Sequence, residues 1–386
     1  MNKKGLVSII ATILGLIAGA ILMFATGHNA FAGFMYLIQG GTKSLERIGN
    51  TIATATPLIL TGLSLTFAFR TGLFNIGTPG QMLFGGLCAT IISHTVTLPR
   101  PLLLIVIILA AFLGGALWAA VPGLLKALFN VHEVVSCIMM NWIGYWMIYY
   151  VVKDYFPNGS KTTESLPLAD KLTLRASWLS RLFDGSYINI GIIIALIAVL
   201  CIAFILNQTT FGYELKAVGF NKDAAQYAGI SVNQSVVYSM MIAGGFAGLA
   251  GLTQYLGVAT NIQIGVMPSQ GFDGIAVALL GATTPLGSLL AALFFGLLYG
   301  GRGFMSVMTD IPPEIADTII ATIIYFAATS VLVERVLDKI MSSKANKADK
   351  AFASETLINT AIQNTDSQNE SIGFMPPTEN EKKGDQ

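Results

Sequence analysis

Two short segments carry residue types that bind metal ions or phosphate in other proteins. The run at 132–136, His-Glu-Val-Val-Ser, begins like the HExxH motif of zinc proteases, in which two histidines share one helix face. Ser136 stands where the second histidine would be, so we do not expect a metal site. The run at 40–44, Gly-Gly-Thr-Lys-Ser, lacks the upstream glycine spacing and the preceding strand of a phosphate-binding loop. The sequence thus predicts no catalytic residues, no cofactor in this chain and no ATP bound by the chain itself.

The composition indicates which solvent surrounds the chain. Its 386 residues are 54% hydrophobic and only 11% charged, with a mean hydropathy of +0.67. Soluble domains carry about 25% charged residues, so a soluble enzyme is excluded, as is a disordered or fibrous protein. The net charge of +1 offers no concentrated basic patch for nucleic acid. We therefore expect a protein whose main solvent is lipid.

Charge divides the chain into two parts. Residues 1–337 carry 16 Lys/Arg and 13 Asp/Glu, whereas the 49 residues at 338–386 carry 6 and 8. We expect a transmembrane domain at 1–337 and a polar, mostly disordered cytoplasmic tail at 338–386. The three cysteines lie in apolar runs without metal-site spacing, which predicts plain packing roles for Cys88, Cys137 and Cys201.

Long apolar runs predict an all-α polytopic membrane protein with about ten transmembrane helices, since about 20 apolar residues span a bilayer. The predicted spans are 5–26, 50–69, 82–98, 101–121, 134–152, 187–206, 233–256, 272–284, 286–301 and 314–333. The first run exceeds the 7–15 apolar residues of a signal peptide, so we favour an uncleaved helix. The Gly-Ala-Thr-Thr-Pro-Leu-Gly run at 281–287 is expected to break the pair of spans around it. Lys and Arg near the span ends favour both termini inside.

Small residues recur at four-residue spacing, a pattern that lets helix backbones approach closely in lipid. They are Gly15 and Gly19, then Gly244, Ala247, Gly248 and Gly251, then Gly296 and Gly300.

Ionisable residues are scarce within the spans, which argues against a proton-coupled carrier. His94 lies within a span, whereas a second group sits at span ends, where interface snorkelling suffices: Asp273, Arg302, Glu314 and Asp317.

Uncharged, Gly- and Pro-rich stretches at 71–81 and 281–287 predict broken helices, because unpaired backbone cannot face lipid. They either line a transport pathway or form ordinary turns. For a pathway we expect amide and indole groups, which suit neutral ring-containing solutes; the alternative role is hydrogen bonding between helices. The candidate pathway residues are Asn75, Gln81, Asn141, Trp142 and Gln254.

Two polar loops offer surfaces for other proteins. The loop at 207–232 is expected to form two short helices, broken at Gly219 and ended at Gly229, with Asn221 capping the second. It suits either docking onto a partner or a simple hairpin between spans. The loop at 153–186, on the other side, contains either a short docking helix or a simple solvated segment.

A resemblance separates these alternatives. Residues 209–230 follow the pattern T-x-F-G-x-x-L-x-A-V-G-x-N-x-x-A-A-x-Y-A-G-I, which resembles the cytoplasmic loop of bacterial ABC importer permeases of the ribose and branched-chain amino acid superfamily. The likeness extends to Asn-Ile-Gly-x-x-Gly-Gln-Met at 75–82, to Glu133-Val-Val with Asn141, and to 274–287. Within that superfamily the chain resembles the larger permease subunit of nucleoside importers served by basic-membrane-protein lipoproteins. Phe220 and the polar tail depart from the family pattern.

The resemblance implies a transport subunit in the bacterial cytoplasmic membrane that moves nucleosides by alternating access. It implies a separate cytosolic ATPase that holds ATP and Mg, a second homologous permease in a homo- or heterodimer, and an extracytoplasmic lipoprotein. Residues 211–230 would be the coupling helix, with these coupling residues: Phe211, Gly212, Glu214, Ala217, Gly219, Ala224, Ala225, Gly229 and Ile230. A permease of the same fold for a sugar or an amino acid, or a stand-alone secondary carrier, is the alternative.

Overall fold

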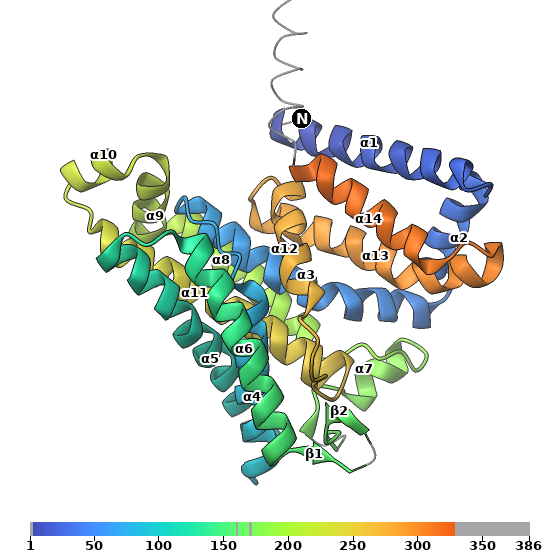
Figure 1. The fold of residues 1–386 in the computed structure, drawn as a ribbon, viewed down its shortest axis with the longest axis horizontal. Coiled ribbons are helices and arrows are strands. Elements are labelled where there is room, and N and C mark those ends of the chain that lie inside the picture. Colours follow the sequence, from blue (N-terminus) through green and yellow to red (C-terminus); the bar gives the residue numbers. More distant parts are fainter. Residues whose placement is uncertain (1–2, 160, 170–171, 329–386) are drawn as a thin grey trace, which may run out of the picture. The chain divides into compact units, whose positions relative to one another are not determined.

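The computed structural model describes residues 3–159, 161–169 and 172–328 (Figure 1). The predicted tail at 338–386 lies outside these residues, as does the end of the predicted span at 314–333. Within them the chain is helical apart from one two-stranded antiparallel sheet, so the predicted all-α class is confirmed.

The elements follow one another without long irregular stretches. The helices before the sheet are α1 (Lys3–Ala25), α2 (Ala30–Thr42), α3 (Leu45–Arg70), α4 (Thr78–Thr95), α5 (Arg100–Phe129) and α6 (Glu133–Tyr155). The sheet pairs β1 (Pro157–Asn158) with β2 (Lys161–Ser165). The later helices are α7 (Ser177–Leu182), α8 (Gly191–Gln208), α9 (Thr210–Phe220), α10 (Lys222–Tyr227), α11 (Val232–Thr253) with its π-helical extension η2 (Gln254–Val258), α12 (Ser269–Leu280), α13 (Pro285–Thr309) and α14 (Pro313–Ala328).

Seven of the described helices are long and apolar enough to cross a membrane: α1, α3, α5, α6, α8, α11 with η2, and α13. The other predicted spans correspond to α4, α12 and α14, which have 18, 12 and 16 residues. At 1.5 Å per residue α12 is about 18 Å long, short of the roughly 30 Å hydrocarbon core. A multi-pass membrane protein is thus confirmed, whereas the count of ten spans stays a prediction.

The predicted break at 281–287 is present. α12 ends at Leu280 and α13 begins at Pro285, and between them Ala282 and Thr283 have φ values of 52° and 51°. The Thr284 hydroxyl then accepts a hydrogen bond from the Gly287 N–H and caps α13. The chain therefore reverses direction within a few residues.

Helices α3 and α11 form the centre of the bundle. In their most apolar stretches 83% and 78% of residues are buried, against at most 39% in the other five long helices. Both are rich in small and hydroxyl-bearing residues, which allow neighbours to approach on all sides.

The glycines of α11 are the places where α4 and α5 come closest to it. A Cβ added to Gly248 would lie 2.1 Å from the Ala111 carbonyl oxygen of α5, and one added to Gly251 would lie 2.0 Å from that of Met82 in α4. Gly244 faces Gly115 in the same way. The packing role predicted for the α11 glycines is confirmed, because any side chain there would displace backbone.

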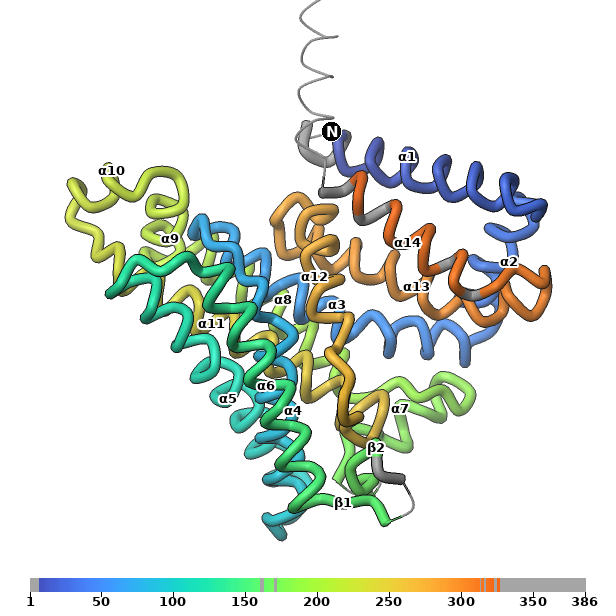
Figure 2. The backbone as a smooth tube through the Cα atoms, viewed as in Figure 1, coloured from blue at the N-terminus to red at the C-terminus, as the bar shows by residue number. Residues whose placement is uncertain are grey.

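The opposite side of α3 packs on the C-terminal helices. Gly296 of α13 faces Thr51 and Ala55 of α3, and the Thr66 and Ser288 hydroxyls are 2.7 Å apart. α1 lies along α14, where Gly19 faces Ile319, so the two ends of the described chain are neighbours (Figure 2). α3 thus joins the α4–α5–α11 group to the α12–α13–α14 group.

The segment between α6 and α8 is an ordered cap rather than a free loop. Its backbone bonds to η2 and to the chain that follows it: the Leu174 N–H donates to the Leu256 carbonyl, and the Ser165 N–H to that of Ile262. The short helix α7 lies within this segment, as one of the two alternatives predicted.

Candidate functional site

The loop at 207–232 forms a helical hairpin, α9 and α10, that follows α8 directly (Figure 1). The break falls at Asn221, two residues after the predicted position at Gly219. Asn221 is extended, and its side chain accepts a hydrogen bond of 3.0 Å from the Ala224 N–H, as the predicted cap requires. Gly229, with φ of 84°, follows the end of α10.

Gly219 lies within helix α9 and does not break it. It is the residue at which α9 packs against the end of α3. A Cβ there would lie 2.2 Å from the Arg70 carbonyl oxygen and 3.0 Å from the Gly72 nitrogen. Gly212, at the other end of α9, approaches the Ile205 carbonyl of α8 as closely. Among the other predicted coupling residues, Phe211 packs its ring against Tyr238 of α11, at 6.5 Å between centroids. Three of the nine predicted coupling residues therefore hold the hairpin in place.

The outer face of the hairpin carries aromatic residues that are not among the predicted coupling residues. Phe220 and Tyr227 are each 95% exposed, and Tyr213 is 71% exposed. Of the remaining predicted residues, Ala225 is buried, Glu214, Ala217 and Ile230 are half-buried, and Ala224 and Gly229 are exposed. The sequence feature that indicates these residues is the presence of large aromatic side chains in a polar loop, because such residues often anchor protein interfaces.

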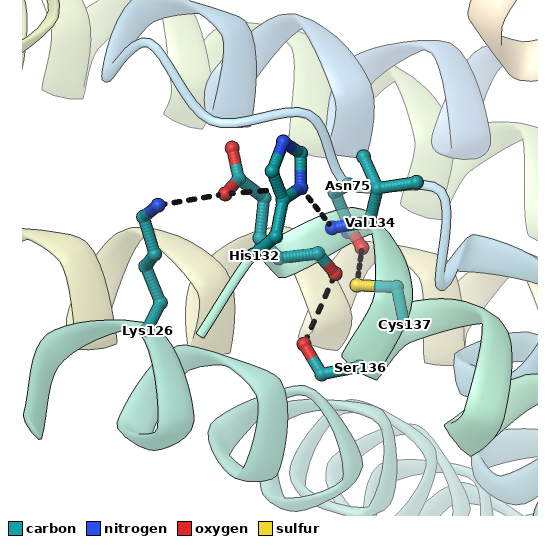
Figure 3. A network of polar contacts seen from close by, with 7 residues as sticks. Asn75, Lys126, His132, Val134, Ser136 and Cys137 are labelled. Carbon is teal, nitrogen blue, oxygen red and sulfur yellow. Dashed lines mark hydrogen bonds and ion pairs between the residues drawn. The ribbon is translucent and has the colours of Figure 1, made fainter. Parts of the chain in front are cut away.

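The stretch at 71–81 packs against protein. Asn75 and Gln81 exchange two side-chain hydrogen bonds of 2.9 Å, and Asn141 bonds to the Gly80 N–H and the Ile76 carbonyl, also at 2.9 Å. These three predicted pathway residues therefore form one buried amide network. Cys137 extends it with a weak 3.8 Å contact to Asn75 (Figure 3).

The other two candidates for the pathway lie apart from this network. Trp142 is 53% exposed on α6, where it begins a run of edge-to-face ring contacts through Tyr145 and Trp146. Gln254 is half-buried at the start of η2. The five residues are thus not gathered around one space in this conformation.

His132 and Glu133, the residues of the incomplete zinc motif, join α5 to α6. His132 Nδ1 accepts a hydrogen bond from the Val134 N–H at 3.3 Å and so caps α6. Glu133 makes an ion pair of 3.0 Å with Lys126 across the turn (Figure 3). Both residues therefore act in the turn that connects the two helices.

A polar cavity of about 590 Å³ lies among α3, α12, α13 and α14. Its lining includes Thr54, Tyr187, Ser269, Gln270, Asp273, Tyr299, Arg302, Glu314 and Asp317. The Tyr299 hydroxyl donates to Asp273 Oδ2 at 2.9 Å, and Arg302 pairs with Asp317 at 2.7 Å. The four charged residues that the sequence places at span ends thus line a single space.

The hairpin and the cavity are at opposite ends of α3. Gly219 of the hairpin meets Arg70, the last residue of α3, whereas the cavity is lined by Thr54 and Leu58, between the start and the middle of the helix. The α6–α8 cap belongs to the cavity end, since Ser186 packs on Gly49 and Tyr187 bonds to Thr54 at 3.0 Å. One end of α3 therefore makes a close backbone contact, and the other borders a polar cavity.

These features define a multi-pass membrane protein with separate surfaces at its two ends. The chain belongs to the family described as branched-chain amino acid transport system / permease component, which matches residues 47–328. This membership confirms the resemblance found in the sequence.

Known relatives cover nearly the whole chain. The guanosine ABC transporter permease protein NupP of Bacillus subtilis is 42% identical over 342 residues, which are 88% of this chain and 98% of that protein. The nucleoside ABC transporter permease protein NupB of Lactococcus lactis subsp. cremoris is 38% identical, over 90% and 97%. A second B. subtilis protein, the guanosine ABC transporter permease protein NupQ, is 30% identical over 64% of this chain and 78% of its own. No solved structure matches.

Proposed function

We propose that this chain is the membrane-spanning permease subunit of an ATP-driven ABC importer for nucleosides. The observation that carries the proposal is the extent of similarity to two permeases named for guanosine and nucleosides, which spans almost their full lengths. The scarcity of charged residues in the spanning helices fits a neutral solute. The chain itself supplies a pathway and conformational change, while a separate ATPase holds ATP and Mg.

The α9–α10 hairpin is proposed as the contact with that ATPase. Its exposed aromatic tip offers anchors for a partner, and its base is fixed to α3 by direct backbone contact at Gly219. A displacement of the hairpin is thus passed to the centre of the bundle rather than absorbed by side chains. Nucleotide binding drives the change by favouring one of two states of the bundle.

The partners follow from the same proposal. NupP and NupQ are two guanosine permeases of one organism that both match this chain, which supports a pore built from two homologous permeases. We place the hairpin end and both termini in the cytoplasm of a bacterial plasma membrane. The cavity end then faces an extracytoplasmic substrate-binding lipoprotein.

The amide network is proposed to contribute to the pathway when the bundle changes state. Asn75 and Gln81 bond to each other in this conformation, and Asn141 of α6 bonds to the Gly80 N–H and the Ile76 carbonyl. These bonds join α6 to α4 and to the turn before α4. Helix rearrangement that separates them would release donors and acceptors toward a solute. The assignment of these three residues, with Trp142 and Gln254, to the pathway stays a prediction.

Uptake of tritiated guanosine and uridine tests the proposed function. Cells that express this chain with its ATPase, lipoprotein and second permease are compared with cells that lack only this chain. We expect uptake to depend on this chain and on ATP. Unlabelled uridine should compete with the labelled nucleosides, whereas unlabelled ribose and leucine should not. Uptake by this chain alone, driven by an ion gradient, would instead indicate a secondary carrier.

A further inference from the structure

The polar cavity at the outer end of α3 contains a carboxylate with unused hydrogen-bonding capacity. Asp273 lies one turn into α12, half-buried, and accepts a hydrogen bond from Tyr299. Among the described residues, Asp273 forms no ion pair, and the Arg302 guanidinium in the same cavity is paired with Asp317. An ionised carboxylate offers about four acceptor positions, so one phenol leaves most of them free.

Charge placement shows that this space is not a lipid-facing dent. Charged side chains at membrane depth face protein or water, since hydrocarbon cannot solvate them. Here four such residues point into one cavity together with the amide of Gln270 and the hydroxyls of Ser269 and Tyr187. A second, smaller cavity of about 230 Å³ shares Tyr187 and Gly300 with it and adds Glu46, Arg47 and Asn50. The polar space thus continues along α3 toward its first residues.

The size and the walls of the cavity match a particular kind of solute. Small-molecule sites measure about 300–1,000 Å³ and hold a few convergent polar groups, and this one measures about 590 Å³. Gln270 and Asp273 are three residues apart on α12, so they share one face of the helix. The rings of Tyr187 and Tyr299 supply flat surfaces beside them.

A carboxylate recognises a pair of neighbouring hydroxyls by accepting a hydrogen bond from each, and acidic residues bind ribose in this way in dinucleotide-binding proteins. Hydrogen bonds to a charged acceptor are about twice as strong as neutral ones. From the geometry we infer that this cavity is the receiving site for the solute and that Asp273 binds the 2′- and 3′-hydroxyls of the ribose. Tyr299 is a positioning residue that holds the carboxylate toward the cavity. The inference rests on the proposed function, since it names the part of a nucleoside that the permease reads.

Paired uptake measurements in cells with the complete importer test the inference. Tritiated guanosine and tritiated 2′,3′-dideoxyguanosine are supplied separately to cells carrying the wild type, Asp273→Asn or the matched control Asp184→Asn. Asp184 is an exposed aspartate in the cap between α6 and α8, with φ of 47°, a conformation that asparagine tolerates, and it lies outside the cavity lining. The lipoprotein is identical in all cells, so its own preference cancels.

We expect the wild type and Asp184→Asn to prefer guanosine, and Asp273→Asn to lose about tenfold or more of that preference. The loss should come from guanosine alone, with dideoxyguanosine uptake unchanged. An equal fall for both solutes, or an unchanged preference, would overturn the inference while leaving nucleoside transport intact. Wild-type cells that import neither solute, but import free ribose or glucose, would overturn the proposed function and this inference together.

A second variant covers the case in which Asp273→Asn does not reach the membrane at the wild-type level, as measured by immunoblotting. Tyr299→Phe keeps the ring and the carboxylate and removes only the hydroxyl that holds Asp273. We expect a smaller fall in the same preference, about two- to fivefold, again confined to the solute with hydroxyls. A normally expressed Tyr299→Phe protein with wild-type preference would refute the role of Asp273 in that case.

Discussion

The two ends of α3 differ in what fills the space around them. At the Arg70 end, backbone meets backbone: Gly219 rests on the Arg70 carbonyl, and Thr71 and Ser239 join their hydroxyls at 2.7 Å. At the Thr54 end the neighbouring helices leave a cavity of about 590 Å³ with charged walls. A contact that transmits a displacement must have no slack, whereas a site that receives a solute must have both room and spare hydrogen bonds.

The largest effect is expected at the tight end. Gly219→Val would place two methyl groups beside a backbone carbonyl that already lies 2.2 Å from the added Cβ position. Uptake should fall by about 100-fold, because overpacking a close contact costs up to about 3 kcal/mol. ATP hydrolysis by the complex should continue without being linked to transport.

The matched control is Gly159→Val, since an added Cβ at Gly159 meets no atom within 4 Å. It should import solute at the wild-type rate. Normal uptake by a Gly219→Val protein present at wild-type level in the membrane would show that α9 does not need its contact with α3.

The tip of the hairpin should give an intermediate effect. Tyr227 is 95% exposed, so Tyr227→Ala should leave the fold intact and weaken association with the ATPase subunit by about tenfold, the loss of one interface anchor. The measurement is a titration of purified ATPase onto the permease pair in nanodiscs. Trp178→Ala, which removes an exposed aromatic residue at the cavity end, is the control and should leave that affinity unchanged. Equal affinities for all three proteins would exclude Tyr227 from the contact.

The smallest effect should come from the ion pair between Lys126 and Glu133. Both side chains are partly exposed, at 16% and 12%, and the pair spans a turn beside the tight end. A double-mutant cycle with Lys126→Ala and Glu133→Ala should give a coupling energy below about 1 kcal/mol, measured by thermal unfolding in detergent. A coupling of several kcal/mol would mean that electrostatics, and not backbone fit, holds this end.

Local features of the fold could be predicted from the sequence, and long-range ones could not. The break at 281–287 and the cap at Asn221 depend on residues near one another in the chain, and both are present. The close-packing glycines of α11 are indicated by their own spacing, although the sequence does not identify the helices they contact. The packing position of Gly219 depends on Arg70, almost 150 residues earlier in the chain. No sequence pattern in either segment indicates that the two residues are in contact.

The cavity illustrates the same limit. Three residues of the cavity, Asp273, Tyr299 and Asp317, each lie near the end of an apolar run. When each helix is considered alone, the simplest interpretation is that these residues lie at the membrane–water interface. Only the packing of α12, α13 and α14 on α3 brings them around one space. Asn75 and Gln81 are predicted from the sequence as pathway residues, with hydrogen bonding between helices as the alternative. That they bond to each other depends on the turn between α3 and α4.

Arg70 serves two stages in the life of the protein. In the orientation proposed above, the guanidinium at the end of α3 helps to keep that end in the cytoplasm during insertion. After folding, its Nε donates a 2.9 Å hydrogen bond to the carbonyl of Thr283, a residue in the chain reversal between α12 and α13. Lysine would preserve the charge that guides topology but not the planar donor that the reversal needs. The substitution Arg70→Lys would therefore preserve the membrane topology. The folded protein would lack the hydrogen bond from Arg70 to the Thr283 carbonyl at the turn.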